Sequence, residues 1–175
     1  MEFAPTISRE TLRPLLVAIL VIVVPLIHLG GPLLLARVGP RWGWSGGYPT
    51  SLNLLGLLPV IIGASLLGWI LITMLGVTRT LPPRVHLGFR PARLVQTGPY
   101  AWMRHPIYVA ESCLRVGMIV LLGSPVAAAV FMGLALAGSN WGITREELAL
   151  EEQFGEEYRV YRARVPALPH FRRAR

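Results

Sequence analysis

The sequence contains no lysine and no aspartate, and only 15% of its 175 residues are charged. Soluble domains usually carry about 25% charged residues, so this shortage indicates a membrane protein. Hydrophobic residues make up 53% of the chain, which agrees with that interpretation. The single cysteine, Cys113, excludes an internal disulfide framework and a metal site with several cysteine ligands. We predict no metal site.

Several catalytic signatures are also missing. The sequence has no glycine-rich phosphate loop, no His-Glu-x-x-His zinc motif and no Gly-x-Ser-x-Gly nucleophile turn. It also lacks the pattern of a soluble dinucleotide-binding fold. An enzyme built from this chain must therefore form its cofactor site from membrane helices and their cytosolic ends.

Four apolar runs indicate the fold class, because about 20 apolar residues suffice to span a bilayer as a helix. The runs cover residues 14–35, 52–77, 106–122 and 126–143. The sequence thus predicts an all-α, polytopic membrane protein with about four hydrophobic helices in a single membrane-embedded domain, 1–175. Residues 1–77 hold two N-terminal spans, and residues 106–143 form a helical hairpin near the lower length limit for spanning. In the second run, Ala64 and Gly68 form a small-xxx-small pair that favours close helix packing.

Two polar segments flank the hairpin. Residues 78–105 form a connection, and residues 144–175 form a C-terminal helix and tail. Apolar residues recur at three- and four-residue spacing over 144–165, so this helix is predicted to be amphipathic. Thr144 and Glu147 have the spacing of a capping box at its start. The members of the apolar stripe are Leu150, Phe154, Tyr158, Tyr161 and Val165.

The arginines indicate the orientation. Apart from Arg37, Arg41 and Arg115, every arginine lies in the N-terminal tail, the 78–105 connection or the C-terminal segment. Four spans place these segments on one side, which the positive-inside rule identifies as the cytoplasm. We therefore expect an integral protein of a bacterial-type inner (plasma) membrane, with its termini and active site cytosolic. This bias accounts for the net charge of +8 without a nucleic-acid partner.

The stretch GPYAWMRHPIYVAE, residues 98–111, places polar groups where a membrane helix begins. Pro106 suits the first turn of a helix, so the helix should begin there with His105 at the cap. A helix N-terminus attracts anions, and Arg104 adds positive charge. Alternatively, Arg104 is a topology charge, and Tyr100 and Tyr108 belong to an interfacial aromatic belt. Both interpretations stay open on these residues alone.

Other ionisable residues also allow two interpretations. Glu111 and Arg115 lie within a predicted span, where ionisable groups are functional candidates, but their spacing also suits a structural ion pair. The glutamates of 146–152 are either functional or a solvated acidic face. His28 lies in the first span with no carboxylate nearby in sequence, and we predict a histidine that has satisfied hydrogen bonds or faces another helix, rather than a ligand.

Two blocks of the sequence together resemble a known family. The first is LVQTGPYAWMRHPIYVAE, with Leu-Val, Gly-x-Tyr and Arg-His-Pro-x-Tyr in order. The second is REELALEEQFGEEYRVYRARVP, with a glutamate pair, Phe-Gly-x-x-Tyr and Arg-Val-Pro. This arrangement, with a helical hairpin between the blocks, resembles the isoprenylcysteine carboxyl methyltransferase and phospholipid methyltransferase group. The resemblance covers about residues 92–166.

The resemblance implies an integral membrane methyltransferase that uses S-adenosylmethionine (SAM) and acts on a lipophilic or lipid-linked substrate from the bilayer. It implies that Leu94 and Val95 line the nucleoside and that Tyr100 packs against the cofactor. The carboxylate of SAM suits the helix start beside Arg104, and its ammonium and sulfonium suit Glu146 and aromatic faces. Arg145 and Glu146 are the predicted catalytic residues. The predicted cradle at the helix start consists of His105, Pro106, Ile107 and Tyr108.

The sequence departs from the family pattern at two positions. Ala110 stands where the family often has glycine. Gly142 stands four residues before Glu146, where members that methylate a prenylcysteine carboxylate carry arginine. Arg145 is close but faces another direction of the helix. The acceptor, a carboxylate, a thiol or a lipid, therefore stays open, as does a non-catalytic binding, transport or accessory role on the same scaffold. The oligomeric state is not predicted.

Overall fold

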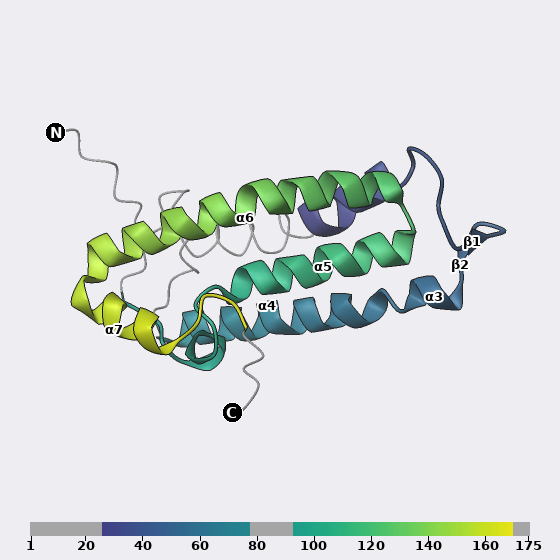
Figure 1. The fold of residues 1–175 in the computed structure, drawn as a ribbon. Coiled ribbons are helices and arrows are strands. Elements are labelled where there is room, and N and C mark those ends of the chain that lie inside the picture. The colour runs from purple at the N-terminus through teal and green to yellow at the C-terminus, as the bar shows by residue number, and fades with distance from the viewer. Residues whose placement is uncertain (1–25, 78–92, 170–175) are drawn as a thin grey trace, which may run out of the picture.

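The computed structural model describes residues 26–77 and 93–169, and most of these are helical (Figure 1). The all-α prediction holds for them apart from one small hairpin, which was not predicted: β1 (Trp44–Ser45) pairs antiparallel with β2 (Tyr48–Pro49). Parts of the predicted first span, the connection and the tail lie outside the described residues. The helical elements are η2 (a π-helix, Leu26–Gly30), α2 (Gly31–Leu35), α3 (Ser51–Leu54), α4 (Leu57–Val77), η4 (a 3-10 helix, Gly98–Ala101), α5 (Pro106–Leu122), α6 (Pro125–Phe154) and α7 (Glu156–Arg164).

The helices α4, α5 and α6 run alongside one another and reverse direction at each connection (Figure 1). The short η2 and α2 contact α5, and α2 also contacts α6. The β-hairpin lies at one end of the bundle and α7 at the other (Figure 1). Two segments that are remote in sequence therefore lie at the end of the bundle that carries α7. They are η4 and the C-terminal end of α6 (Figure 1).

The predicted start of the third hydrophobic helix is confirmed. Pro106 is the first residue of α5, and His105 is its N-cap. The helix ends at Leu122, because Gly123 adopts a left-handed conformation with φ of 58°. Ser124 then caps α6 by accepting a hydrogen bond from the backbone N–H of Ala127 at 3.1 Å. These local signals determine the two ends of α5 and place its N-terminus at the polar end of the bundle.

The predicted boundary between the fourth hydrophobic helix and the polar helix is wrong. Helix α6 continues without a break from Pro125 to Phe154, so Thr144 lies inside a helix and caps nothing. No helix-breaking residue separates the two segments, and the break comes instead at Gly155, with φ of 52° and ψ of −121°. One rigid helix therefore carries Glu146 from the apolar segment into the polar end.

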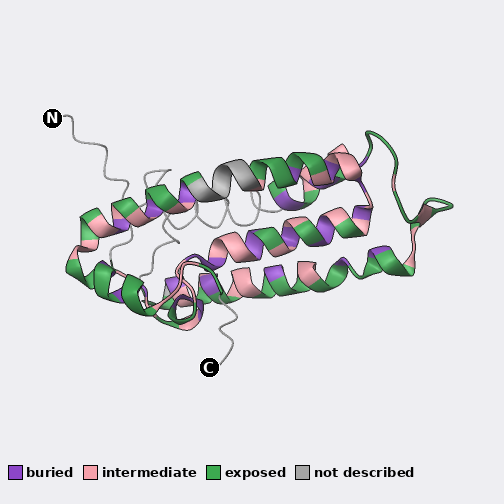
Figure 2. Cartoon of the chain, in the orientation of Figure 1, coloured by how far each residue is buried: buried purple, intermediate pink, exposed green. Residues whose placement is uncertain are grey.

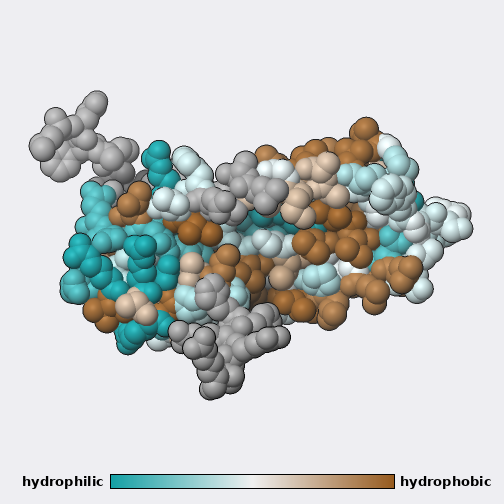
Figure 3. Space-filling model, viewed as in Figure 1, coloured by the Kyte–Doolittle hydropathy of each residue, from teal (hydrophilic) through white to brown (hydrophobic). Residues whose placement is uncertain are grey.

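One helical stretch in the described part of the chain, Ser51–Met74, is long and apolar enough to cross a bilayer, with a mean hydropathy of 2.3. Only 17% of its most apolar window is buried within the protein, unlike the core helix of a soluble domain. Exposed residues follow α4, and apolar surface covers the sides of the bundle (Figures 2 and 3). The apolar segments Leu26–Leu35 and Pro125–Ala135 are shorter. A four-span arrangement stays a prediction.

Glycines allow α4 and α5 to approach closely, but not the pair that the sequence suggested. A Cβ added at Gly63 would lie 2.7 Å from the carbonyl oxygen of Ala110, and one at Gly117 would lie 2.6 Å from that of Gly56. Among the described residues, a Cβ added at Gly68 would meet no atom within 4 Å, and Ala64 is exposed. The Ala64–Gly68 pair therefore does not make the α4–α5 contact, since this face of α4 points away from α5.

Substituting Gly63 by alanine should lower the free energy of unfolding by about 1–3 kcal/mol, because the added methyl group meets rigid backbone. The matched control is Gly68→Ala in the same helix, which meets no atom. That variant should be neutral or more stable by up to about 1 kcal/mol, since alanine is the better helix former. Thermal unfolding in detergent, followed by tryptophan fluorescence, measures both. Equal effects at the two positions would contradict this account of the α4–α5 contact.

Candidate functional site

A pocket lies at the polar end of the bundle, where the chain passes from η4 into α5 and where α6 meets α7. It contains about 510 Å³ of empty space, part of which is open to solvent. All nine residues predicted to bind the cofactor line it. They are Leu94, Val95, Tyr100, Arg104, His105, Pro106, Ile107, Tyr108 and Glu146. The structure thus brings together two sequence blocks that are about 40 residues apart.

The loop before α5 is held against the end of α4 by a glycine. Gly98 has φ of 58°, and a Cβ there would lie 3.0 Å from Cγ2 of Thr73. This close contact explains why the Gly-x-Tyr motif begins with glycine. It allows Tyr100 and Val95 to pack with Met74 of α4 in one buried cluster. The floor of the pocket therefore comes from α4 and the loop together.

His105 lies between the two carboxylates of the glutamate pair. Its Nδ1 is 3.4 Å from Oε2 of Glu146, and its Nε2 is 3.1 Å from Oε1 of Glu147. The His105 side chain is only 3% exposed, and its ring contacts Tyr108 edge to face at 5.8 Å. The helix cap of α5 is thereby tied to α6, and Glu146 is held at the pocket wall.

Arg104 serves the fold more than the predicted anion site. Its guanidinium donates to Oε1 of Glu147, through Nε at 3.0 Å and also through Nη2, and to the carbonyl oxygens of Arg162 and Val165. The backbone N–H of Arg104 donates to the carbonyl of Pro166 at 2.9 Å, and that of His105 to the carbonyl of Ala167 at 3.1 Å. Arg104 lines the pocket, but its guanidinium donates hydrogen bonds to α6, to α7 and to the residue after α7.

The contacts of Glu147 shift its titration. Burial alone would raise the pKa of this carboxyl, but hydrogen bonds from Arg104 and His105 outweigh burial and lower the pKa below the usual 4.5. Burial, followed by the negative charge of Glu147, raises the pKa of Tyr158 to about 12. The Tyr158 hydroxyl is therefore neutral at physiological pH, whereas Glu147 is ionised.

A depressed pKa predicts how stability depends on pH. Folded Glu147 releases its proton more readily than the unfolded chain does, so its stabilisation is present above about pH 4.5 and is lost as the pH falls through the folded pKa. We expect the unfolding midpoint of the wild type to fall as the pH is lowered below about 5. Glu147→Gln should be less stable at neutral pH and should show a weaker decline in acid.

Unfolding in detergent between pH 3 and pH 7 measures this difference. Glu152→Gln is the matched control, because it makes the same chemical change at an exposed carboxylate of the same helix. It should keep the wild-type dependence. A Glu147→Gln variant that declines as steeply as the wild type would contradict the assignment.

Four further residues line the pocket that the motifs did not predict there: Met74, Leu150, Tyr158 and Tyr161. The hydroxyl of Tyr161 donates to the carbonyl oxygen of Tyr100 at 2.7 Å, and burial raises the pKa of Tyr161. Leu150, Tyr158 and Tyr161 form one buried cluster, against which Leu94 packs. The predicted apolar stripe contains these three residues, but the sequence pattern does not show that they cover the pocket.

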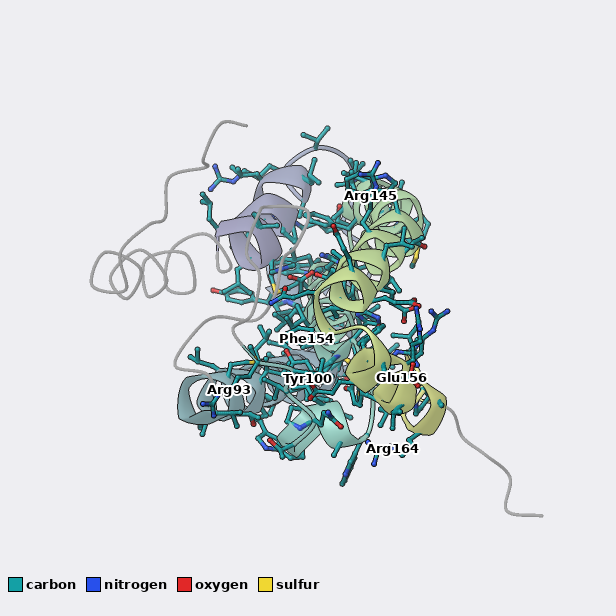
Figure 4. All side chains as sticks on the ribbon, turned by 90° about the vertical axis from the view of Figure 1, so that its left-hand side faces the viewer. Arg93, Tyr100, Arg145, Phe154, Glu156 and Arg164 are labelled. Carbon is teal, nitrogen blue, oxygen red and sulfur yellow. The ribbon has the colours of Figure 1, made fainter. Side chains whose placement is uncertain are left out.

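Arg145 does not reach the pocket. It is exposed, and its guanidinium lies over the ring of Trp141 at 5.2 Å. Figure 4 looks onto the polar end and places Arg145 at the outer edge of α6, away from Tyr100 in the interior. At Gly142, an added Cβ would lie 3.4 Å from Cζ of Tyr108, with the hydroxyl closer still. Tyr108 thus fills the space where a side chain at position 142 would emerge.

Two predictions about ionisable residues in the apolar region have different outcomes. The ion pair of Glu111 and Arg115 is confirmed, with Oε2 of Glu111 2.9 Å from Nη2 of Arg115. His28 faces another helix, α5, as one of its two predicted alternatives states, but its hydrogen bonds are not all satisfied: among the described residues, its buried Nδ1 has no hydrogen-bond partner. Nε2 of His28 lies 3.7 Å from Oε1 of Glu111, a carboxylate that is remote in sequence.

A comparison with protein families confirms the resemblance. The isoprenylcysteine carboxyl methyltransferase (ICMT) family matches residues 54–152, more than half of the chain. The chain belongs to this family. The matched range runs from α3 to the last turn of α6, so it includes Glu146 and the whole Arg-His-Pro block, and it stops before α7.

Curated relatives carry the same family name. Human protein-S-isoprenylcysteine O-methyltransferase is 40% identical over 78 residues, which are 42% of this chain and 26% of the relative. The Schizosaccharomyces pombe protein is 38% identical over 74 residues, covering 42% and 31%, and the Arabidopsis thaliana B form is 36% identical over 75 residues, covering 43% and 38%. The chain thus spans about a quarter to two fifths of the length of these relatives. No solved structure matches it significantly.

Proposed function

We propose that this protein transfers a methyl group from SAM to a lipophilic acceptor that reaches the pocket from the bilayer. One observation supports this function above all others. The nine residues predicted to bind the cofactor, drawn from both blocks, surround a single pocket. A chance likeness of two short motifs would not be expected to place both of them around one cavity.

The chemistry of the lining fits SAM. Its walls are mostly apolar and aromatic, which suits the nucleoside, and Tyr100 and Tyr108 offer ring faces to a sulfonium. Glu146 is buried to 6% exposure at the wall and supplies negative charge for an ammonium group. The N-terminus of α5, the positive end of the helix dipole, suits a carboxylate. When bound, SAM supplies the electrophilic methyl group.

The residues of the chain would then position the reactants. In-line displacement at a methyl group needs no covalent enzyme intermediate, so rate acceleration comes from orientation and from the exclusion of water. His105 and Glu146 would hold the cofactor, and the neutral Tyr158 hydroxyl would close the wall without adding charge. Arg145 was the other predicted catalytic residue, but its exposed position gives that role no support.

We further propose the four-span topology, with the pocket at the cytosolic surface. The polar, arginine-rich end of the bundle carries the pocket, and the apolar sides of α4 would face lipid (Figure 3). Arginine-rich segments are retained in the cytoplasm. SAM would therefore enter from the cytosol, and the acceptor would enter from the membrane.

Binding of S-adenosylhomocysteine to the detergent-purified protein, measured by calorimetry, tests the cofactor. Transfer of tritium from methyl-labelled SAM to a panel of lipids, lipophilic thiols and prenylcysteines tests the reaction. We expect binding together with labelling of at least one acceptor. Binding without transfer to any acceptor would favour a non-catalytic role on the same scaffold, and an absence of binding would exclude both the cofactor and the activity.

A further inference from the structure

Three ionisable side chains meet in the apolar part of the bundle, apart from the residues assigned to the cofactor. His28 comes from η2, and Glu111 and Arg115 come from α5. His28 and Glu111 are almost fully buried, at 3% and 6% exposure. Ionisable groups in such surroundings are costly and usually serve a function. Arg115 neutralises Glu111 at 2.9 Å, but the Nδ1 atom of His28 has no hydrogen-bond partner in the part of the chain that the structure describes.

Helix geometry places this group next to the pocket. Ile107 and Tyr108 line the pocket, and Glu111 follows them by one helical turn on the same side of α5. Helical side chains lean towards the N-terminus of their helix, so the Glu111 side chain leans back over the turn that contains Ile107 and Tyr108. The group therefore lies about one helical turn from the pocket, towards the apolar part of the bundle.

The two ring nitrogens of His28 have different surroundings. Nε2 faces the Glu111 carboxylate at 3.7 Å, whereas Nδ1 is buried and unpartnered. A proton on Nε2 points to the carboxylate, which leaves Nδ1 as a hydrogen-bond acceptor. A histidine oriented by a carboxylate, with its other nitrogen facing a substrate, is the arrangement of a general base. Such contacts often shorten only when the reactants are bound. His28 also lies in a π-helical turn, a distortion common at functional sites.

We propose that His28, oriented by Glu111, accepts the proton of a lipophilic thiol, which is the methyl acceptor. This inference rests on the proposed function and specifies its substrate class. Nδ1 takes the proton from the S–H group, and the thiolate electron pair forms the new S–CH3 bond. The bond between the methyl group and the SAM sulfur breaks in the same step, and its electron pair stays on S-adenosylhomocysteine. The imidazolium then returns its proton to solvent.

The charges around His28 favour a neutral acceptor. Glu111 is already paired with Arg115, so a carboxylate or an ammonium group arriving from the bilayer would bring an unpaired charge into an apolar site. A thiol or an alcohol arrives uncharged. An imidazole is basic enough to deprotonate a thiol but not an alcohol, and the thiolate is the reactive form of a thiol. Of the neutral acceptors, the thiol is therefore the one that this base can activate.

Two thiols of different acidity test the role of His28. Octanethiol is protonated at neutral pH and needs a base, whereas 4-nitrothiophenol is already a thiolate and needs none. For His28→Phe, we expect kcat/KM with octanethiol to fall by about 10²–10⁴-fold, while kcat/KM with 4-nitrothiophenol stays near the wild-type value. Glu111→Gln should show a smaller loss with the same selectivity, and Glu111→Asp should lie between Glu111→Gln and the wild type. Glu152→Gln, the same change at an exposed carboxylate, should affect neither thiol.

The other results each have a definite meaning. Equal losses with both thiols indicate a structural role and overturn the proposal, as does a wild type that labels N-acetyl-S-farnesylcysteine or decylamine but not octanethiol. Calorimetry with S-adenosylhomocysteine separates failure of the proposed function from failure of the His28 proposal. A wild type that does not bind S-adenosylhomocysteine contradicts the proposed function itself. A His28→Phe variant that has lost this binding is misfolded, and the test then passes to Glu111→Asp. A loss with octanethiol but not with 4-nitrothiophenol in that variant supports the proposal, and equal losses with both thiols overturn it.

Discussion

Replacing Glu146 by glutamine should weaken the binding of S-adenosylhomocysteine by about 10- to 100-fold while the fold stays intact. A hydrogen bond to a charged group contributes about 1.5–3 kcal/mol, and each 1.4 kcal/mol changes a dissociation constant tenfold. Glu146 lines the pocket and is nearly buried, so its charge is poorly screened by solvent. Glutamine keeps the shape of the side chain and removes only the charge.

Calorimetry with S-adenosylhomocysteine measures the affinity, and thermal unfolding in detergent measures the fold. Glu151→Gln is the matched control, since Glu151 lies on the same helix but pairs with Arg159 and Arg162 outside the pocket. It should bind as the wild type does. If Glu146→Gln also binds as the wild type does, Glu146 does not contact the ammonium group of the ligand, and its assignment to the cofactor is wrong.

The sequence predicted the pocket because local chemistry determines most of its elements. Pro106 sets the start of α5, Gly98 sets the turn before it, and the apolar stripe of Tyr158 and Tyr161 sets the face of α7 that covers the site. Each of these three features depends on a residue type that is typical of a particular backbone conformation or environment. The two motif blocks could then be joined into one site through the family resemblance.

Other features depend on contacts between remote segments, and the sequence did not reveal them. Whether Gly63 or Gly68 faces α5 depends on the rotation of α4, which an almost uniformly apolar helix does not encode. His28 and Glu111 are more than 80 residues apart, so no local pattern pairs them. The extent of α6 was missed for a different reason. A change from apolar to polar residues suggests a boundary there, although neither Ile143 nor Thr144 breaks a helix.

Arg104 also depends on contacts with remote segments, and its substitution should have a large effect on stability. The helix N-terminus and the positive charge suggested an anion site, but the structure directs the guanidinium to Glu147 and to two carbonyl oxygens of the C-terminal segment. Arg104→Gln should therefore lower the free energy of unfolding by about 1.5–3 kcal/mol, because the partly buried Glu147 carboxylate loses its closest charged partner. His105 and Arg162 still contact this carboxylate. Loss of cofactor binding should follow from loss of the pocket wall.

Arg104→Lys distinguishes this role from direct binding of an anion. A lysine keeps the charge but cannot donate in several directions from a planar fork, so it should restore only part of the stability. Thermal unfolding and S-adenosylhomocysteine binding, measured on the same samples, give the comparison. Arg159→Gln is the control, since its ion pairs lie in solvent and its loss should leave the unfolding midpoint unchanged. If Arg104→Lys unfolds as the wild type does but binds the ligand weakly, Arg104 contacts the ligand directly. If both properties fall together, Arg104 acts by holding α7 and the C-terminal segment over the pocket.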